Sequence, residues 1–169
     1  CAMFAPVFIN LFLLTILDKD RRVVFIQSYS GDWNKQINDM SIVLKQYKPI
    51  VYAESNGVGD PLVSQLRLKY GNVKEFVMSN SSKKEIVEQL RMNIVLQDIQ
   101  IPTSKLYPEL LKEMGNYTYS LTKTGLITYH HRAGEHDDNL DALMLSNYAY
   151  NNHSAGFKAV GGRYSSFYN

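Results

Sequence analysis

Three aspartates lie within five residues near the C-terminal end of this 169-residue chain. Asp137, Asp138 and Asp141 open the segment EHDDNLDALMLSNYAY, residues 135–150, whose later residues are mostly apolar or aromatic, as in a buried helix. On a helix, Asp141 shares a face with Asp137 at spacing i, i+4 and with Asp138 at i, i+3. Two interpretations stay open. In the first, the acids cap the helix and complement its dipole. In the second, they surround a cation, because like charges on one face of a helix repel one another unless a cation lies between them.

A further acid, Glu54, is expected to reach the same place from a different element. The segment PIVYAES is typical of a short buried strand, and it runs from Glu54 into the turn residues Asn56 and Gly57. Sites in α/β sheets form at the carboxyl ends of strands, so Glu54 is expected to meet Asp138 and Asp141 there. Mg²⁺ and Mn²⁺ prefer oxygen ligands, and two such ions can activate a water and stabilise the leaving oxygen of a phosphodiester. The expected cofactor is therefore Mg²⁺ or Mn²⁺ in a two-ion site.

Composition and motifs exclude several other kinds of site. Cys1 is the single cysteine, which excludes an internal disulfide framework and a cysteine-based zinc site. The sequence has no GxSxG segment and no GxxxxGK[ST] segment, so neither a serine nucleophile of that type nor a Walker-type ATP site is expected. Glycosidases need only two carboxylates and usually show aromatic platforms nearby. The net charge is +2, so any nucleic-acid surface must be local.

The N-terminal apolar run, Ala2–Leu17, is expected to contain a strand and not a membrane span. It is shorter than the roughly 20 residues that a spanning helix needs, and Pro6 and Asn10 interrupt it. Residues 11–17 are typical of a buried strand, and Asp18–Asp20 of the turn into a second strand. No contact with a membrane is expected.

Apolar periodicity predicts one α/β domain with a mixed sheet flanked by helices. Asp60 is expected to cap a helix that starts at Pro61, and Ser82 with Glu85 to form a capping box for the next helix. The expected elements are a hairpin over 11–29, helices over 32–47, 60–71, 79–98 and 103–117, strands over 49–55 and 73–78, a second hairpin over 117–130 and the acidic helix over 135–150.

The segment VYAESNGVGDPLVSQLR resembles the strand, acidic residue and Asn-Gly turn in the nuclease domain of phage terminase large subunits. SKKEIVEQLRMNI, IQIP, YPELLKEM and HDDNLDALMLSNYAY then follow in that family's order, so the resemblance covers Leu11 to Tyr150. It implies a ribonuclease-H-like, retroviral-integrase-type fold. The expected domain covers residues 1–152, and residues 153–169 are expected to form a flexible basic-aromatic tail.

The resemblance also implies an activity and site roles. It implies that Glu54 is a catalytic metal ligand from the sheet and that Asp138 is the ligand from the helix, with Asp141 assisting. Asp137 is the alternative to Asp138, because adjacent helical residues cannot point the same way. The implied activity is metal-dependent hydrolysis of double-stranded concatemeric DNA by an endonuclease domain.

One departure from the family pattern bears on this activity. Phe4 stands where the family has a first-strand aspartate, which is expected to weaken metal binding. A catalytically degenerate domain that binds DNA or a partner is therefore one alternative. A junction-resolvase-like nuclease, suggested by the DNLDAL spacing, is another.

Basic side chains near these acids are the expected DNA contacts. Lys83 and Lys84 open a helix, and His130, His131 and Arg132 are expected in the loop that leads to the acidic helix. By resemblance, the partners are double-stranded DNA, an ATPase motor domain, the small terminase subunit and the portal. The setting implied is the cytoplasm of the host cell of a phage or prophage.

Overall fold

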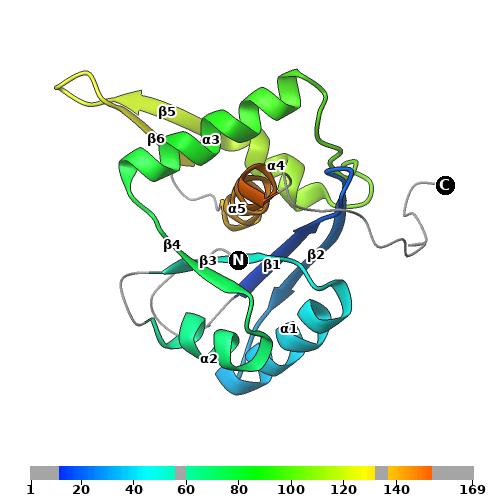
Figure 1. Ribbon diagram of the computed structural model, residues 1–169. Helices are drawn as coiled ribbons and strands as arrows, with labels where there is room; N and C mark the ends of the chain where they lie inside the picture. The colour runs from blue at the N-terminus through cyan, green and yellow to red at the C-terminus, as the bar shows by residue number, and fades with distance from the viewer. Residues whose placement is uncertain (1–11, 56–59, 132–136, 154–169) are drawn as a thin grey trace.

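The buried helix α5, Asp138–His153, runs between two groups of elements, as Figure 1 shows. The computed structural model describes residues 12–55, 60–131 and 137–153. The remaining elements, in chain order, are β1 (Phe12–Leu17), β2 (Val23–Tyr29), α1 (Trp33–Tyr47), β3 (Val51–Ser55), α2 (Pro61–Tyr70), β4 (Val73–Val77), α3 (Asn80–Val95), α4 (Pro108–Asn116), β5 (Tyr117–Leu121) and β6 (Ile127–His131). This order confirms the predicted succession of elements.

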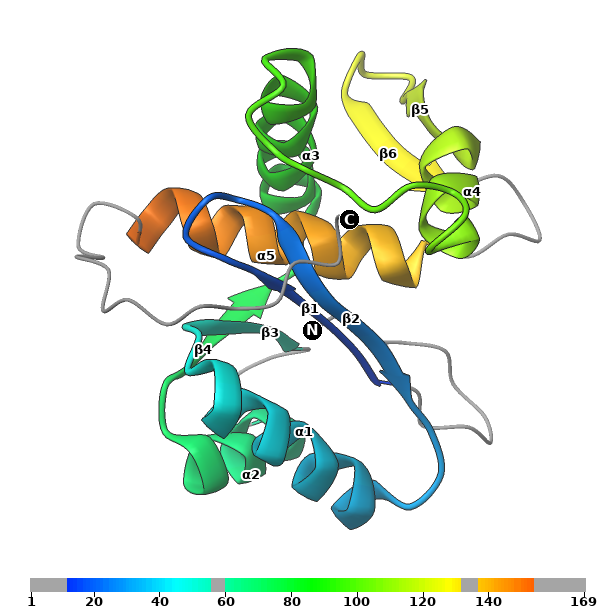
Figure 2. The same ribbon diagram turned by 90° about the vertical axis from the view of Figure 1, so that its right-hand side faces the viewer.

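The strands pair in both directions, which gives the mixed α/β character predicted from the sequence. β1 pairs antiparallel with β2, and β3 pairs parallel with β4 in a register that sets Glu54 opposite Phe76. β5 and β6 form the second antiparallel hairpin. Among the described residues these are three two-stranded ladders. In Figure 2 the β1–β2 hairpin crosses in front of α5, the β3–β4 pair lies below α5, and α1 and α2 lie below both pairs.

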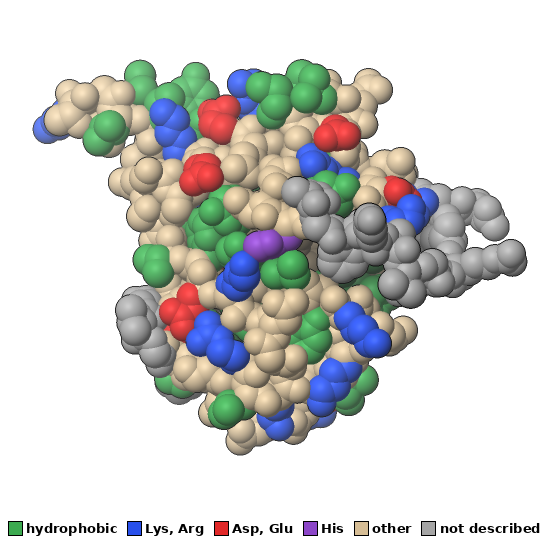
Figure 3. Space-filling model, in the orientation of Figure 1, with side chains coloured by type: hydrophobic (Ala, Val, Ile, Leu, Met, Phe, Trp, Pro, Cys, Tyr) green, Lys and Arg blue, Asp and Glu red, His purple; other side chains and the backbone are tan. Residues whose placement is uncertain are grey.

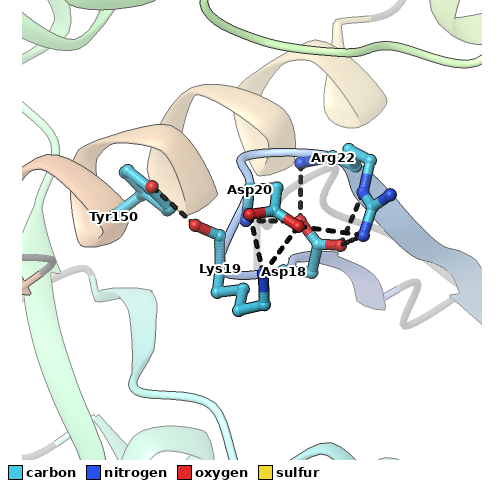
Figure 4. A network of polar contacts seen from close by, with 5 residues as sticks. All are labelled: Asp18, Lys19, Asp20, Arg22 and Tyr150. Carbon is cyan, nitrogen blue, oxygen red and sulfur yellow. Dashed lines mark hydrogen bonds and ion pairs between the residues drawn. The ribbon is translucent and has the colours of Figure 1, made fainter. Parts of the chain in front are cut away.

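The turn between β1 and β2 is held by its own acidic residues (Figure 4). The Asp18 side chain accepts hydrogen bonds from the backbone N–H groups of Asp20 and Arg22, each at 2.9 Å, and pairs with the Arg22 guanidinium at 2.7 Å. The Tyr150 hydroxyl of α5 donates to the carbonyl oxygen of Lys19 at 2.8 Å. The predicted turn is therefore confirmed, and it is fastened to the central helix.

Local capping chemistry sets the helix ends. Asp60 accepts from the backbone N–H of Leu62 at 2.9 Å, and Gly71 ends α2 with a φ of +92°, which favours glycine. The predicted capping box of Ser82 with Glu85 is wrong. Ser79 caps α3 and exchanges hydrogen bonds with Ser82, because the helix begins three residues earlier than the pattern suggested.

Helix α5 is buried on more than one face. Leu140, Leu143, Met144 and Leu145 belong to a cluster with residues of α3 and α4, and Ala142 packs in another cluster against Leu13 of β1. The polar side chains of Asp141 and Asn147 are buried as well. A helix that is buried on several faces is typical of a core position.

Polar contacts fix α5 against its neighbours. The Ser146 hydroxyl donates to the Thr15 carbonyl oxygen at 2.6 Å, and the Asn93 amide donates to the Asn147 side-chain oxygen at 2.7 Å. No helix among the described residues has the length and apolar character to cross a membrane.

Two predicted boundaries differ in the structure. His130 and His131 do not lie in a loop. They belong to β6, because the ladder with β5 continues through Thr118–His130 and Tyr117–His131 pairs. His153, predicted to start the tail, is the last residue of α5. Residues 154–169 lie outside the described residues.

Candidate active site

The ammonium of Lys83 lies between two of the aspartates that open α5. Its Nζ is 2.8 Å from Asp141 Oδ2 and 3.3 Å from Asp137 Oδ2. Lys83 comes from the first turn of α3, which the Ser79 cap begins, and its side chain is only 18% exposed. The like charges on this face of α5 are thus compensated by a cation from the chain itself.

The electrostatics of Asp141 reflect burial and crowding by other acids. Burial raises the pKa of Asp141 to about 7, the charges of Asp137 and Glu54 also raise it, and Lys83 opposes them. Its Oδ1 is buried and has no hydrogen-bond partner among the residues that the structure describes. Asp141 therefore has one buried carboxylate oxygen to which no described residue donates a hydrogen bond.

Lys83 remains charged in this setting. Burial lowers the pKa of Lys83, but the charges of Asp141, Tyr117 and Asp137 and the hydrogen bond to Asp141 outweigh it and hold this pKa above its usual value. The Lys83 ammonium also lies 5.7 Å from the centre of the Tyr117 ring. The Lys83 ammonium thus contacts Asp137 and Asp141 and lies over the Tyr117 ring.

Glu54 comes from β3. Its side chain is half-buried, and its charge is one of the causes that raise the pKa of Asp141, after burial and the charge of Asp137. Tyr52, two residues earlier on the same face of β3, bonds through its hydroxyl to His153 Nε2 at 2.9 Å. The strand is therefore bonded to the C-terminal end of the helix, and the role of Glu54 as a metal ligand stays a prediction.

Asp138 acts electrostatically on Glu113 of α4. Burial is the main cause that raises the pKa of Glu113, and the charge of Asp138 also raises it. Asp137 shares Lys83 with Asp141. The assignment of Asp137 or Asp138 as a metal ligand stays a prediction.

Glu113 is a site residue that sequence reasoning missed. Its Oε2 accepts from the backbone N–H of Leu140 at 2.9 Å, and its Oε1 accepts from the Asn139 amide. The Tyr107 hydroxyl donates to the Asn139 side-chain oxygen at 3.0 Å. Burial raises the pKa of Glu113, and the hydrogen bonds from Asn139 and Leu140 oppose this. No local signal marks Glu113, because the helix it caps is not its own.

The other predicted DNA contacts lie on more open surface. Lys84 is exposed next to the half-buried Lys83, and His130 is exposed on β6 beside Ser120, 3.2 Å from its hydroxyl. His131 is half-buried, and Arg132 lies outside the described residues. On the face in Figure 3, lysine and arginine side chains are spread out and interspersed with acidic ones. Their role as DNA contacts stays a prediction.

The donor chemistry of the cluster fits a hard divalent cation. No three His, Cys, Asp or Glu side chains within residues 12–55, 60–131 and 137–153 are grouped so as to hold a metal. Mg²⁺, however, is usually held by only one or two carboxylates together with substrate phosphates. The buried Oδ1 of Asp141, which has no hydrogen-bond partner among the described residues, is a carboxylate oxygen of the kind that such a site uses. Phe4 lies outside the described residues.

Comparisons with known proteins agree with this architecture at the level of the fold. No protein-family model matches the chain, and no curated protein matches it. The large terminase nuclease from thermophilic phage G20c with bound cobalt is similar, with a TM-score of 0.69 and 21% identity, covering 86% of this chain and 77% of that chain. The same nuclease with bound magnesium gives a TM-score of 0.67 at 21% identity, over 83% of this chain and 74% of that one.

A nuclease from a second source gives the same result. The large terminase nuclease domain of Thermus phage P74-26 has a TM-score of 0.61 and 18% identity, over 83% of this chain and 77% of that chain. These likenesses extend over most of the chain. The chain therefore has the ribonuclease-H-like fold of phage large terminase nuclease domains.

Proposed function

We propose that this chain is the nuclease domain of a phage terminase large subunit and that it hydrolyses phosphodiester bonds of double-stranded concatemeric DNA. The observation that supports this most directly is the pair of acids, Asp141 and Asp137, around the Lys83 ammonium, with the charge of Glu54 acting on Asp141, on this fold. The similar G20c nuclease has been crystallised with cobalt and with magnesium, which supports a divalent cation as the cofactor. Mg²⁺ or Mn²⁺ is proposed here.

The residues of the chain have distinct roles in this proposal. Asp141 and Glu54 hold the cation, and Asp138 or Asp137 completes the carboxylate set, since Phe4 replaces the first-strand acid. When bound, divalent ions in such a site supply the charge that activates a water and stabilises the leaving oxygen. Lys83 pairs with Asp137 and Asp141 and so compensates their negative charges before DNA binds.

The partners follow from the proposed family. Lys84 and His130 on the open surface are proposed to contact phosphates without reading sequence. An ATPase motor domain, the small terminase subunit and the portal are proposed as assembly partners in the cytoplasm of the host cell.

Cleavage assays on the purified chain test the proposal. With Mn²⁺ and supercoiled or linear DNA, Glu54→Ala, Asp138→Ala and Asp141→Ala are each expected to slow cleavage by about 100-fold or more, the scale of losing a charge-stabilising group. Glu109→Ala, which removes an exposed acid of α4, is the matched control and should cleave like the parent. If the Glu54 and Asp141 variants both cleave at the parental rate, the site is assigned to the wrong residues.

Phe4 favours one competing function, a degenerate domain that binds DNA or a partner without cutting. Calorimetric titration with Mn²⁺ separates the two, because the nuclease must bind the ion and the degenerate domain need not. Adding four-way DNA to the substrate panel tests a junction-resolvase-like activity, for which that substrate should be cut in preference to linear DNA.

A further inference from the structure

The first turn of α5 receives its cap from another helix. The first N–H groups of any helix lack partners within that helix, and an Asp or Asn just before it usually accepts one of them. Here the Leu140 N–H donates to Glu113 of α4 at 2.9 Å, and the backbone of Asn139 also bonds to Glu113. Asp137, well placed by type to cap the helix, has its Oδ2 directed to Lys83 instead.

The Glu113 carboxylate is held rigidly by its surroundings. Its residue is 9% exposed, and α4 is anchored by Leu110, which is completely buried. Asn139 donates to Glu113 Oε1 and accepts from the Tyr107 hydroxyl at 3.0 Å, so a chain of hydrogen bonds runs from the start of α4 to the start of α5. A buried carboxylate is tolerated when it is fully bonded, and the positive end of a helix dipole favours it.

We infer that Glu113 is a positioning residue of the candidate active site, which caps α5 from α4 and so leaves the carboxylates of Asp137 and Asp141 directed toward Lys83 and the proposed cation and not toward the helix terminus. This inference rests on the proposed function. The sequence left two roles open for the aspartates, capping of the helix and binding of a cation. In this inference Glu113 caps the helix, and the aspartates at the helix start bind the cation.

Loss of Glu113 has a specific expected consequence. With the Leu140 N–H unpaired, the nearest acceptors are the aspartates at the helix start, and an aspartate that turns inward to cap α5 no longer faces the cation. The supporting partners of metal-binding groups typically change metal affinity by about 10–100-fold when removed. The same loss is expected here, although Glu113 itself does not touch the cation.

The test compares three variants of the whole chain. Glu113→Ala removes the cap, Glu113→Gln retains an oxygen that can accept from Leu140, and Glu109→Ala removes an exposed acid of the same helix as a control. We expect Glu113→Ala to weaken Mn²⁺ binding by about 10–100-fold in calorimetry and to speed hydrogen exchange of the Leu140 amide. Glu113→Gln should lie between it and the parent, and Glu109→Ala should match the parent.

Each outcome decides for or against the inference. If Glu113→Ala only lowers stability, while its folded form binds Mn²⁺ like the parent, Glu113 is a structural cap and the inference is wrong. If Glu113→Ala does not fold, the Glu113→Gln variant decides by the same two measurements. If the parent binds no Mn²⁺, the proposed function fails. Hydrogen exchange of the Leu140 amide then tests the capping contact by itself. If this amide exchanges at the parental rate in the Glu113 variants, Glu113 does not cap α5 and the inference is wrong.

Discussion

At the scale of single residues, Lys83 explains how three closely spaced aspartates can begin a buried helix. Its ammonium is 2.8 Å from Asp141 and 3.3 Å from Asp137, and all three side chains are less than a fifth exposed. A lysine in that position makes the acids tolerable whether or not a metal is bound. The repulsion that the spacing predicts is real, and the chain compensates it from α3.

Replacing Lys83 with alanine should therefore destabilise the metal-free protein. We expect a loss of about 2 kcal/mol in the free energy of unfolding, less than the roughly 3–5 kcal/mol for breaking a fully buried pair, because Lys83 remains partly exposed. Urea denaturation at neutral pH with a chelator present measures this loss.

The neighbouring lysine is the matched control for Lys83. Lys84→Ala removes an exposed lysine of the same helical turn and should change stability by no more than about 0.5 kcal/mol. Equal effects of the two substitutions would mean that the Lys83 contacts contribute nothing specific.

At the scale of elements, local chemistry predicted most helices, and long-range contacts account for the errors. Asp60, Pro61 and Gly71 mark both ends of α2 within the sequence itself. The histidines at 130 and 131 belong to β6 only because β5 pairs with them, and local sequence does not reveal that pairing. Glu113 escaped detection for the same reason, since its capping contact crosses between helices.

The end of β2 carries a buried tyrosine whose ionisation should be visible at alkaline pH. The Tyr29 hydroxyl has no hydrogen-bond partner among the described residues, and burial, with a contribution from Asp39, raises the pKa of Tyr29 from 10.0 to about 12. Between these two values the folded chain retains a proton that the unfolded chain has lost. Stability therefore falls as the pH rises from 10 to 12.

Tyr29→Phe should remove that contribution. The variant should lose less stability than the parent across this alkaline range, and near neutral pH it should be at least as stable, because an unbonded buried hydroxyl contributes little. Urea denaturation as a function of pH measures both effects. Tyr119→Phe, at an exposed position of β5, is the control, and a parental alkaline loss in Tyr29→Phe would contradict the expectation.

At the scale of the whole molecule, the sequence predicted an α/β fold of ribonuclease-H-like type, and the structure and its similar nucleases confirm it. The central position of α5 in the fold could not be predicted from the sequence. Its apolar residues indicated a buried helix, but only the folded structure shows that α5 lies between the two groups of elements (Figures 1 and 2). The candidate site thus lies at one end of a helix that packs against β1, β3, α3 and α4.

Metal binding should accordingly stabilise the entire fold. At a free Mn²⁺ concentration 100 times its dissociation constant, the free energy of unfolding should rise by about 2.7 kcal/mol. Thermal unfolding with and without the ion measures this as a shift in midpoint. Chelation should abolish cleavage while circular dichroism shows an intact fold, because Lys83 still compensates the acids. Asp141→Asn should lose the Mn²⁺-dependent shift, and a shift that persists in this variant would place the ion elsewhere.

The contact between Tyr52 and His153 joins the C-terminal end of α5 to the strand that carries Glu54. Tyr52 and Glu54 project from the same side of one strand, while His153 lies twelve residues beyond Asp141, about 18 Å along the helix axis. Sliding or rotation of the helix relative to β3 would have to break this remote contact before the two acids could separate. The contact therefore helps to hold Asp141 in place relative to Glu54, although His153 touches neither acid.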